Sequence, residues 1–148
     1  MDVTLFDVIE TGSAKTFRDS MPASGDFSIR VNCPGGDVFE GLAIYNAIRE
    51  HKGTLAGLTV AFLGDGASNM AQSYVLASAT AGMHVRVGSP QEFSPAQSVV
   101  ADAEAIAATT GGSVAIHTDP VAAVAGADVV VTDTWVSMGK EDEKAHRV

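Results

Sequence analysis

The sequence predicts an α/β fold, a Rossmann-like three-layer sandwich around a mainly parallel sheet of about five or six strands. Short apolar strands alternate with helical segments through most of the chain. Strands that are joined through helices run parallel and are covered on both faces. The 148 residues suit one domain with a sizeable core. We therefore expect residues 1–148 to form a single composite domain.

The N-terminal third predicts two strands and a helix. Residues 2–9 (DVTLFDVI) carry β-branched and aromatic side chains without helical spacing, and residues 27–32 (FSIRVN) alternate between apolar and polar. Apolar side chains then recur at three- and four-residue steps over 38–51, which indicates an amphipathic helix. Asp37 suits its N-cap and Gly53 its C-terminal end.

The remainder alternates regularly between strand and helix. The expected strands are 58–63, 84–88, 113–117 and 128–132, and the expected helices are about 67–81, about 95–109 and a short one at 120–126. Right-handed crossovers then predict that the strands beginning at 113, 84, 58 and 128 lie side by side in that order. We expect FSIRVN to pair with the free edge of the last of these, with the first strand of the chain beyond it or nearby.

Charge and cysteine content exclude several classes of function. A net charge of -9 argues against nucleic-acid and anionic-membrane binding, which need a basic surface. The one cysteine, Cys33, cannot form an internal disulfide, and no signal peptide or stretch of about 18 apolar residues is present. These features predict a soluble, cytoplasmic protein. The four scattered histidines give no metal-ligand spacing, and no cofactor motif is evident.

A first glycine-bearing turn, NCPGGD, follows the FSIRVN strand. Its pair, Gly35 and Gly36, lets backbone N–H groups converge at a helix N-terminus, which suits an anion or a developing oxyanion. A plain turn explains the same residues equally well. Both interpretations stay open from the residues alone.

A second turn, GDGASNMAQS, follows the strand at 58–63. It is not a dinucleotide-binding fingerprint. Ser68 stands where a strand passes into a helix, as some nucleophiles do, but a nucleophile needs a base within hydrogen-bond reach. His84 and His117 are the nearest candidates, and each is explained as an ordinary strand residue. A Ser68 triad is therefore disfavoured.

A third turn, TDTWVSMG, follows the last predicted strand. Asp133, Ser137 and the main chain around Met138 would project from the carboxyl end of that strand, next to Asn69 if the predicted strand order holds. A carboxylate, an amide and a hydroxyl in one crevice suit an ammonium group. Trp135 fits a packing lid as well as a binding surface.

From residue 1 to about 52 the chain resembles the Clp protease family, especially the Clp-like head-maturation proteases of phages. The stretch IRVNCPGGDVFEGLAIYNAIREH carries the resemblance. It implies that Gly35 and Gly36 help to form an oxyanion hole. Cys33 departs from the serine usual in that family.

From about 47 to 143 the chain instead resembles the ornithine-binding domain of ornithine carbamoyltransferases. The stretches IREHKGTLAGLTVAFLGDGASNMAQS, AGMHVRVGSP and ADVVVTDTWVSMGKEDE carry this second resemblance. It implies ornithine contacts at Asn69, Asp133, Ser137 and Met138. Ser68 departs from the paired asparagines of that family. IREHKG fits both families, so the helix before Gly53 is the predicted seam between them.

The resemblances favour an engineered chimeric scaffold without a complete active site. Carbamoyl transfer in the second family uses a Ser-Thr-Arg-Thr-Arg loop and a His-Cys-Leu-Pro segment, and neither occurs in these 148 residues. One alternative is a carbamoyltransferase remnant that binds ornithine or a similar amino acid weakly. Another is a Ser or Cys hydrolase of the Clp-like type. A third is a structural module that forms a homodimer through an edge strand.

Overall fold

The computed structural model describes residues 2–5, 28–31, 45–46, 48–133 and 135. The strands are β1 (Asp2–Leu5), β2 (Ser28–Val31), β3 (Thr59–Leu63), β4 (His84–Gly88), β5 (Ser113–His117) and β6 (Val129–Thr132). The helices are α3 (Asn69–Thr80), α4 (Gln97–Thr110) and α5 (Pro120–Val124), with a 3-10 turn, η1, at Gln91–Phe93. Residues 45–46 and 48–52 are also helical.

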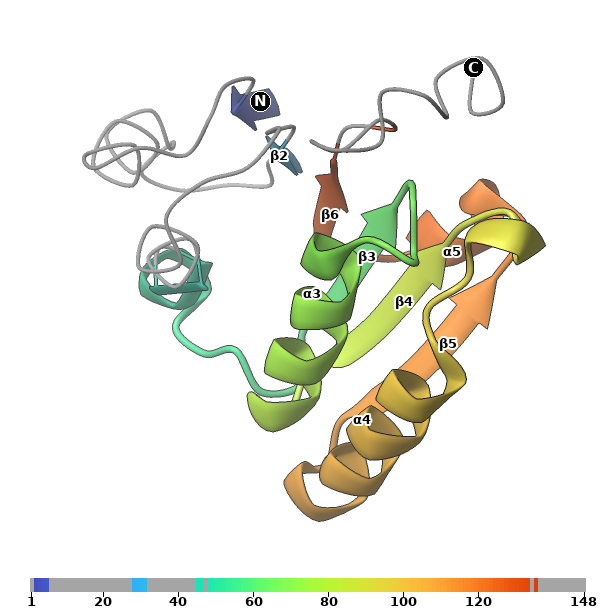
Figure 1. The fold of residues 1–148 in the computed structure, drawn as a ribbon. Helices are drawn as coiled ribbons and strands as arrows, with labels where there is room; N and C mark the ends of the chain where they lie inside the picture. Colours follow the sequence, from blue (N-terminus) through green and yellow to red (C-terminus); the bar gives the residue numbers. More distant parts are fainter. Residues whose placement is uncertain (1, 6–27, 32–44, 47, 134, 136–148) are drawn as a thin grey trace.

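Four of these strands form one parallel sheet in the order β5-β4-β3-β6. This order confirms the prediction for the strands beginning at 113, 84, 58 and 128. Val60 on β3 is level with Val85 on β4 and with Val129 on β6, so the carboxyl ends of neighbouring strands reach the same edge of the sheet. The parallel α/β class is confirmed as well (Figure 1).

The N-terminal strands differ from the prediction. β2 pairs in parallel with β1 as a separate two-stranded sheet, and among the described residues it makes no ladder with β6. β2 nevertheless lies alongside β6, as Figure 1 shows. The prediction that FSIRVN is a fifth hydrogen-bonded strand of the main sheet is therefore wrong, although β6 is its neighbour as predicted. The alternation of FSIRVN sets which side chains share a face, but it does not specify which edge supplies the hydrogen bonds.

The sheet lies between two unequal helical layers. Side chains on one face form the core with α3 and α4, namely Val60, Phe62, Val85, Val87, Val129 and Val131. The opposite face meets the short helix α5, where Arg86 Nη1 donates to the Ala125 carbonyl oxygen at 2.6 Å. The period-two alternation of the strands therefore places the two helical layers on opposite faces of the sheet.

The helical residues 45–46 and 48–52 pack against α3. Ile48 is only 2% exposed and belongs to the same core cluster as β3 and α3. The ring of Tyr74 on α3 lies between two others, with its centroid 5.6 Å from that of Tyr45 and 5.9 Å from that of Phe62. The segment ends as the sequence predicts, at Gly53, which has a φ of 81° and donates its N–H to the Arg49 carbonyl. The predicted N-cap, Asp37, lies outside the described residues.

Helices α3 and α4 pack against each other through small side chains. Ala71 and Ala79 on α3, and Ala103 and Ala107 on α4, are all buried. Alanine at these positions allows the two helices to approach each other and the sheet closely. In the part of the chain that the structure describes, none of the helices has the length and apolar character needed to cross a membrane.

Candidate functional site

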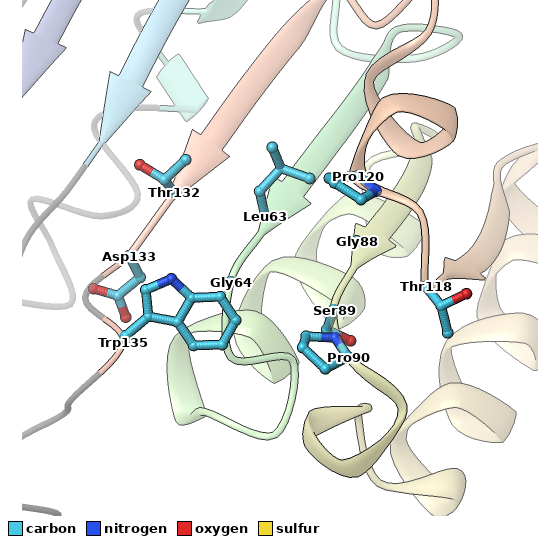
Figure 2. A pocket seen from close by; sticks show the side chains of 10 residues that line it. All are labelled: Leu63, Gly64, Gly88, Ser89, Pro90, Thr118, Pro120, Thr132, Asp133 and Trp135. Atoms are coloured by element: carbon cyan, nitrogen blue, oxygen red, sulfur yellow. The ribbon is translucent and has the colours of Figure 1, made fainter. Parts of the chain in front are cut away.

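A cavity of about 280 Å³ opens where the four strands of the main sheet end. Its lining residues come from the carboxyl ends of β3, β4 and β6 and from the turn between β5 and α5 (Figure 2); they are Leu63, Gly64, Gly88, Ser89, Pro90, Thr118, Pro120, Thr132, Asp133 and Trp135. This edge is where open α/β sheets bind their ligands. Asp133 is the one ionisable side chain among the described residues of the lining.

The turn from β3 into α3 is built around Gly64 and Asp65. Gly64 has a φ of 140°, which L side chains rarely adopt, and it directs the chain away from the sheet. Asp65 is buried, and its Oδ1 accepts the N–H of Ala67 at 2.9 Å. Its carbonyl oxygen accepts the N–H of Ser68 at 3.1 Å. This turn fixes the position at which α3 begins.

Ser68 is the N-cap of α3. Its Oγ accepts the Ala71 N–H at 3.1 Å, which satisfies one of the backbone donors left open at a helix start. The two histidines considered as its base lie elsewhere. His84 begins β4, roughly 13 Å along the strand from its carboxyl end, and its Nδ1 lies 2.9 Å from Ser113 Oγ. The described geometry therefore supports a structural role for Ser68.

His117 lies at the carboxyl edge of the sheet, but on β5, which is not adjacent to β3. It ends β5 and is level with Gly88, so β4 separates it from β3 by about 10 Å in all. Its carbonyl oxygen accepts the N–H of Ser89 at 3.0 Å, and this bond continues the ladder beyond β4. His117 thus helps to shape the cavity edge through its backbone.

The floor of the site includes a hydroxyl that the sequence did not single out. Ser89 is 3% exposed, and its Oγ has no hydrogen-bond partner within the described part of the chain. A methyl group added at Gly66 would lie 2.9 Å from this oxygen and 2.8 Å from the Phe93 carbonyl oxygen. Glycine at position 66 therefore lets the β3–α3 turn approach the segment that follows β4. In the sequence, only the position of Ser89 directly after a strand could have indicated that it belongs to the site.

Asp133 and Trp135 form the β6 side of the cavity. Asp133 is half-buried and follows Thr132 directly, and its carbonyl oxygen would lie 3.8 Å from a Cβ placed on Gly64. Trp135 is 40% exposed, although tryptophan side chains are usually well buried. Its ring makes an edge contact with Phe93 of η1, with 6.1 Å between ring centroids. The end of β6 is thus linked to the segment after β4.

The structure places only some of the predicted site residues. Asp133 lines the cavity, whereas Asn69 is exposed at the first position of α3 and does not line it. Four others lie outside the described residues: Ser137, Met138, Gly35 and Gly36. Cys33 also lies outside them. No group of three or more potential metal ligands occurs among the residues that are described.

Comparison with known proteins identifies the family to which this sheet belongs. A family model described as the aspartate/ornithine carbamoyltransferase, Asp/Orn binding domain, matches residues 56–148, more than half of the chain. The chain belongs to the aspartate/ornithine carbamoyltransferase family. A second model, that of the Clp proteases, matches residues 15–91. The resemblance to two families is therefore shown, with the two matches overlapping over residues 56–91.

Individual relatives agree with the first match. An ornithine carbamoyltransferase from Clavibacter michiganensis is 68% identical over 107 residues, which cover 72% of this chain and 35% of the relative. One from Leifsonia xyli is 59% identical over 120 residues, covering 80% of this chain and 38% of that protein. The chain thus spans somewhat over a third of the length of these curated relatives.

Solved structures of the same family share the fold. Ornithine carbamoyltransferase from Pyrococcus furiosus aligns with 99% of this chain and 45% of its own, with a TM-score of 0.68 and 33% identity. That from Gloeobacter violaceus aligns with 83% of this chain and 49% of its own, with a TM-score of 0.61 and 32% identity.

Proposed function

We propose that this chain carries an amino-acid-binding unit of the carbamoyltransferase type, with ornithine or a similar amino acid as its ligand. The observation that carries the proposal is the cavity at the carboxyl ends of the strands, with Asp133 as its ionisable lining side chain. The match to an Asp/Orn binding domain over residues 56–148 supports the ligand class. This proposal corresponds to the carbamoyltransferase remnant considered above.

The lining residues suit an ammonium-bearing ligand. A carboxylate accepts hydrogen bonds from an ammonium group and attracts its charge, and the hydroxyls of Thr118 and Thr132 add further acceptors. Among the lining residues that the structure describes, none is a lysine, arginine or histidine. We propose that Asn69, Ser137 and Met138 complete the contacts to the amino acid, as the family resemblance implies.

Binding of the amino acid and transfer of the carbamoyl group depend on different segments of sequence. Transfer in the family also uses the Ser-Thr-Arg-Thr-Arg and His-Cys-Leu-Pro segments, which these 148 residues do not contain. Donors that stabilise charge developing in a transition state are each worth about 10²- to 10³-fold in rate. We therefore propose ligand binding, without carbamoyl transfer, as what these residues do by themselves.

Calorimetry with ornithine tests the proposal. Asp133→Asn removes the charge but keeps the size, and we expect it to weaken binding by about 10- to 100-fold, the usual range for a hydrogen bond to a charged group. Glu104→Gln is the matched control, because Glu104 is exposed on α4 and the substitution changes the net charge equally. Absence of ornithine binding by the unmodified chain, or an equal loss in both variants, would contradict the proposal.

We also propose that the chain has a chimeric origin, as a scaffold in which a Clp-protease-like segment adjoins a carbamoyltransferase-like one. The two family matches support this, and so does the position of β2 alongside β6. The segment 45–52 packs into the core formed by β3 and α3, which gives the two parts a shared interior. Removing residues 1–35 should then expose apolar surface and leave insoluble material. A soluble fragment 36–148 with cooperative unfolding would contradict this proposal.

A further inference from the structure

Trp135 is an exposed aromatic side chain at the mouth of the cavity. It is 40% exposed, and with Val121 it is one of two large apolar side chains classed as exposed in the described part of the chain. Folding gains only from the part of this side chain that is removed from water, so burial does not explain the exposed part. In Figure 2 the indole extends from the end of β6 toward Gly64 at the end of β3. Its position is explained better by a ligand than by the core.

The neighbourhood of the indole selects for positive charge. Asp133 lies two residues earlier and lines the same cavity, and the other described side chains in the lining are apolar or bear hydroxyls. A cation over the face of an indole is attracted by the ring quadrupole, and tryptophan is the best side chain for this interaction. A carboxylate and an indole on one wall are complementary to an ammonium group, and the net charge of -9 attracts cations from solution.

Phe93, which belongs to η1, contacts the indole through its ring. The two ring planes are inclined at 68°, an edge arrangement that aromatic pairs prefer. Phe93 belongs to η1, which follows Ser89 and Pro90 in the cavity lining. The contact therefore limits the orientations of Trp135.

We infer that Trp135, positioned by Phe93, determines specificity for an ammonium-bearing ligand by packing its indole against the ammonium group held by Asp133. This inference rests on the proposed function, because it assigns a further contact within the same site. The class of ligand is a small amino acid or diamino acid. A lid that only excludes water would need bulk at position 135, whereas this role needs an aromatic face.

Trp135→Phe and Trp135→Leu separate these two roles, because both keep an apolar side chain and only phenylalanine keeps an aromatic ring. We expect Trp135→Leu to weaken ornithine binding by about 3- to 10-fold in calorimetry and Trp135→Phe to weaken it clearly less. Val121→Ala is the control, because Val121 is 71% exposed on α5 and does not line the cavity; it should leave affinity unchanged. Norvaline, which lacks the side-chain ammonium group, identifies the ammonium group that the indole contacts. If Trp135→Leu weakens the binding of ornithine but not of norvaline, the contact is with the side-chain ammonium group. An equal loss of affinity for both ligands assigns the contact to the α-ammonium group.

Fluorescence provides an independent measurement, because Trp135 is the one tryptophan in the sequence. Ornithine should shift its emission in the unmodified chain, and Phe93→Leu should raise its quenching by acrylamide and weaken binding. Equal losses in Trp135→Leu and Trp135→Phe, or no loss in either, would overturn the inference. If ornithine still binds and Asp133→Asn still weakens it, the proposed function survives that outcome. If the unmodified chain binds no ornithine, both fail.

Discussion

The hydroxyl oxygen of Tyr45 lies 3.0 Å from Oγ of Ser78, across 33 residues of sequence. This hydrogen bond joins Tyr45 to the last turn of α3, and Ser78 is fully buried. Around it, the ring of Tyr74 contacts those of Tyr45 and Phe62. The Clp-protease-like stretch that contains Tyr45 is thus connected to the carbamoyltransferase-like part by a polar contact within an aromatic cluster.

Removing one partner of this bond should be costly. Tyr45→Phe leaves the buried Ser78 hydroxyl without this partner, and we expect the free energy of unfolding to fall by about 1–3 kcal/mol. Ser78→Ala in the same chain should recover part of the loss, because the double variant buries no orphaned hydroxyl there. Urea denaturation of the two single variants and the double variant measures the coupling. Strictly additive losses would show that the two hydroxyls do not interact.

Alkaline pH should weaken the same contact. Burial raises the pKa of Tyr45 above its usual value of 10.0, while the hydrogen bond from Ser78 partly offsets the rise. Above pH 10 the unfolded chain then releases the phenolic proton more readily than the folded one, so stability falls as pH rises. Below pH 10 this contribution is constant. Denaturation between pH 8 and pH 11 should show a shallower loss for Tyr45→Phe; identical slopes would rule out Tyr45 as a source.

The main sheet could be predicted from the sequence because each of its strands carries two independent signals. The alternation of residues in 84–88 and in 113–117 marks strands, and the intervening helices force parallel, right-handed connections. The pairing of β2 could not be predicted, because a four-residue strand carries no information about which edge will supply its hydrogen bonds. The alternation of residues within a strand determines which side chains share a face, whereas the partner strand depends on the rest of the chain.

The site was only partly predictable for a related reason. Asp133 was identified because a carboxylate after a strand suggests binding, and it does line the cavity. Ser89, Gly88 and Phe93 carry no such chemical signal. Their importance comes from proximity across the sheet edge, such as the approach of Gly66 to Ser89 Oγ, which sequence spacing does not report.

Ser68 should affect stability and not catalysis. Ser68→Ala removes the N-cap of α3, and we expect a loss of about 1 kcal/mol in the free energy of unfolding. Ser68→Asn keeps a capping side chain and should be close to neutral. Labelling with a fluorophosphonate, followed by mass spectrometry, tests the alternative role. Stoichiometric modification of Ser68 in the unmodified chain would restore the hydrolase interpretation.

Gly88 should control the shape of the cavity. A methyl group at this position would lie 2.6 Å from Leu63 Cδ2 and 3.0 Å from the Cβ of Ala123. Because Leu63 also lines the cavity, its side chain would have to move, and we expect Gly88→Ala to cost about 1–3 kcal/mol and to weaken ornithine binding. Leu63→Ala removes the clashing methyl groups, so adding Gly88→Ala to it should cost much less than in the unmodified chain. An equal cost in both backgrounds would locate the clash at Ala123 on α5 and leave the cavity unaffected.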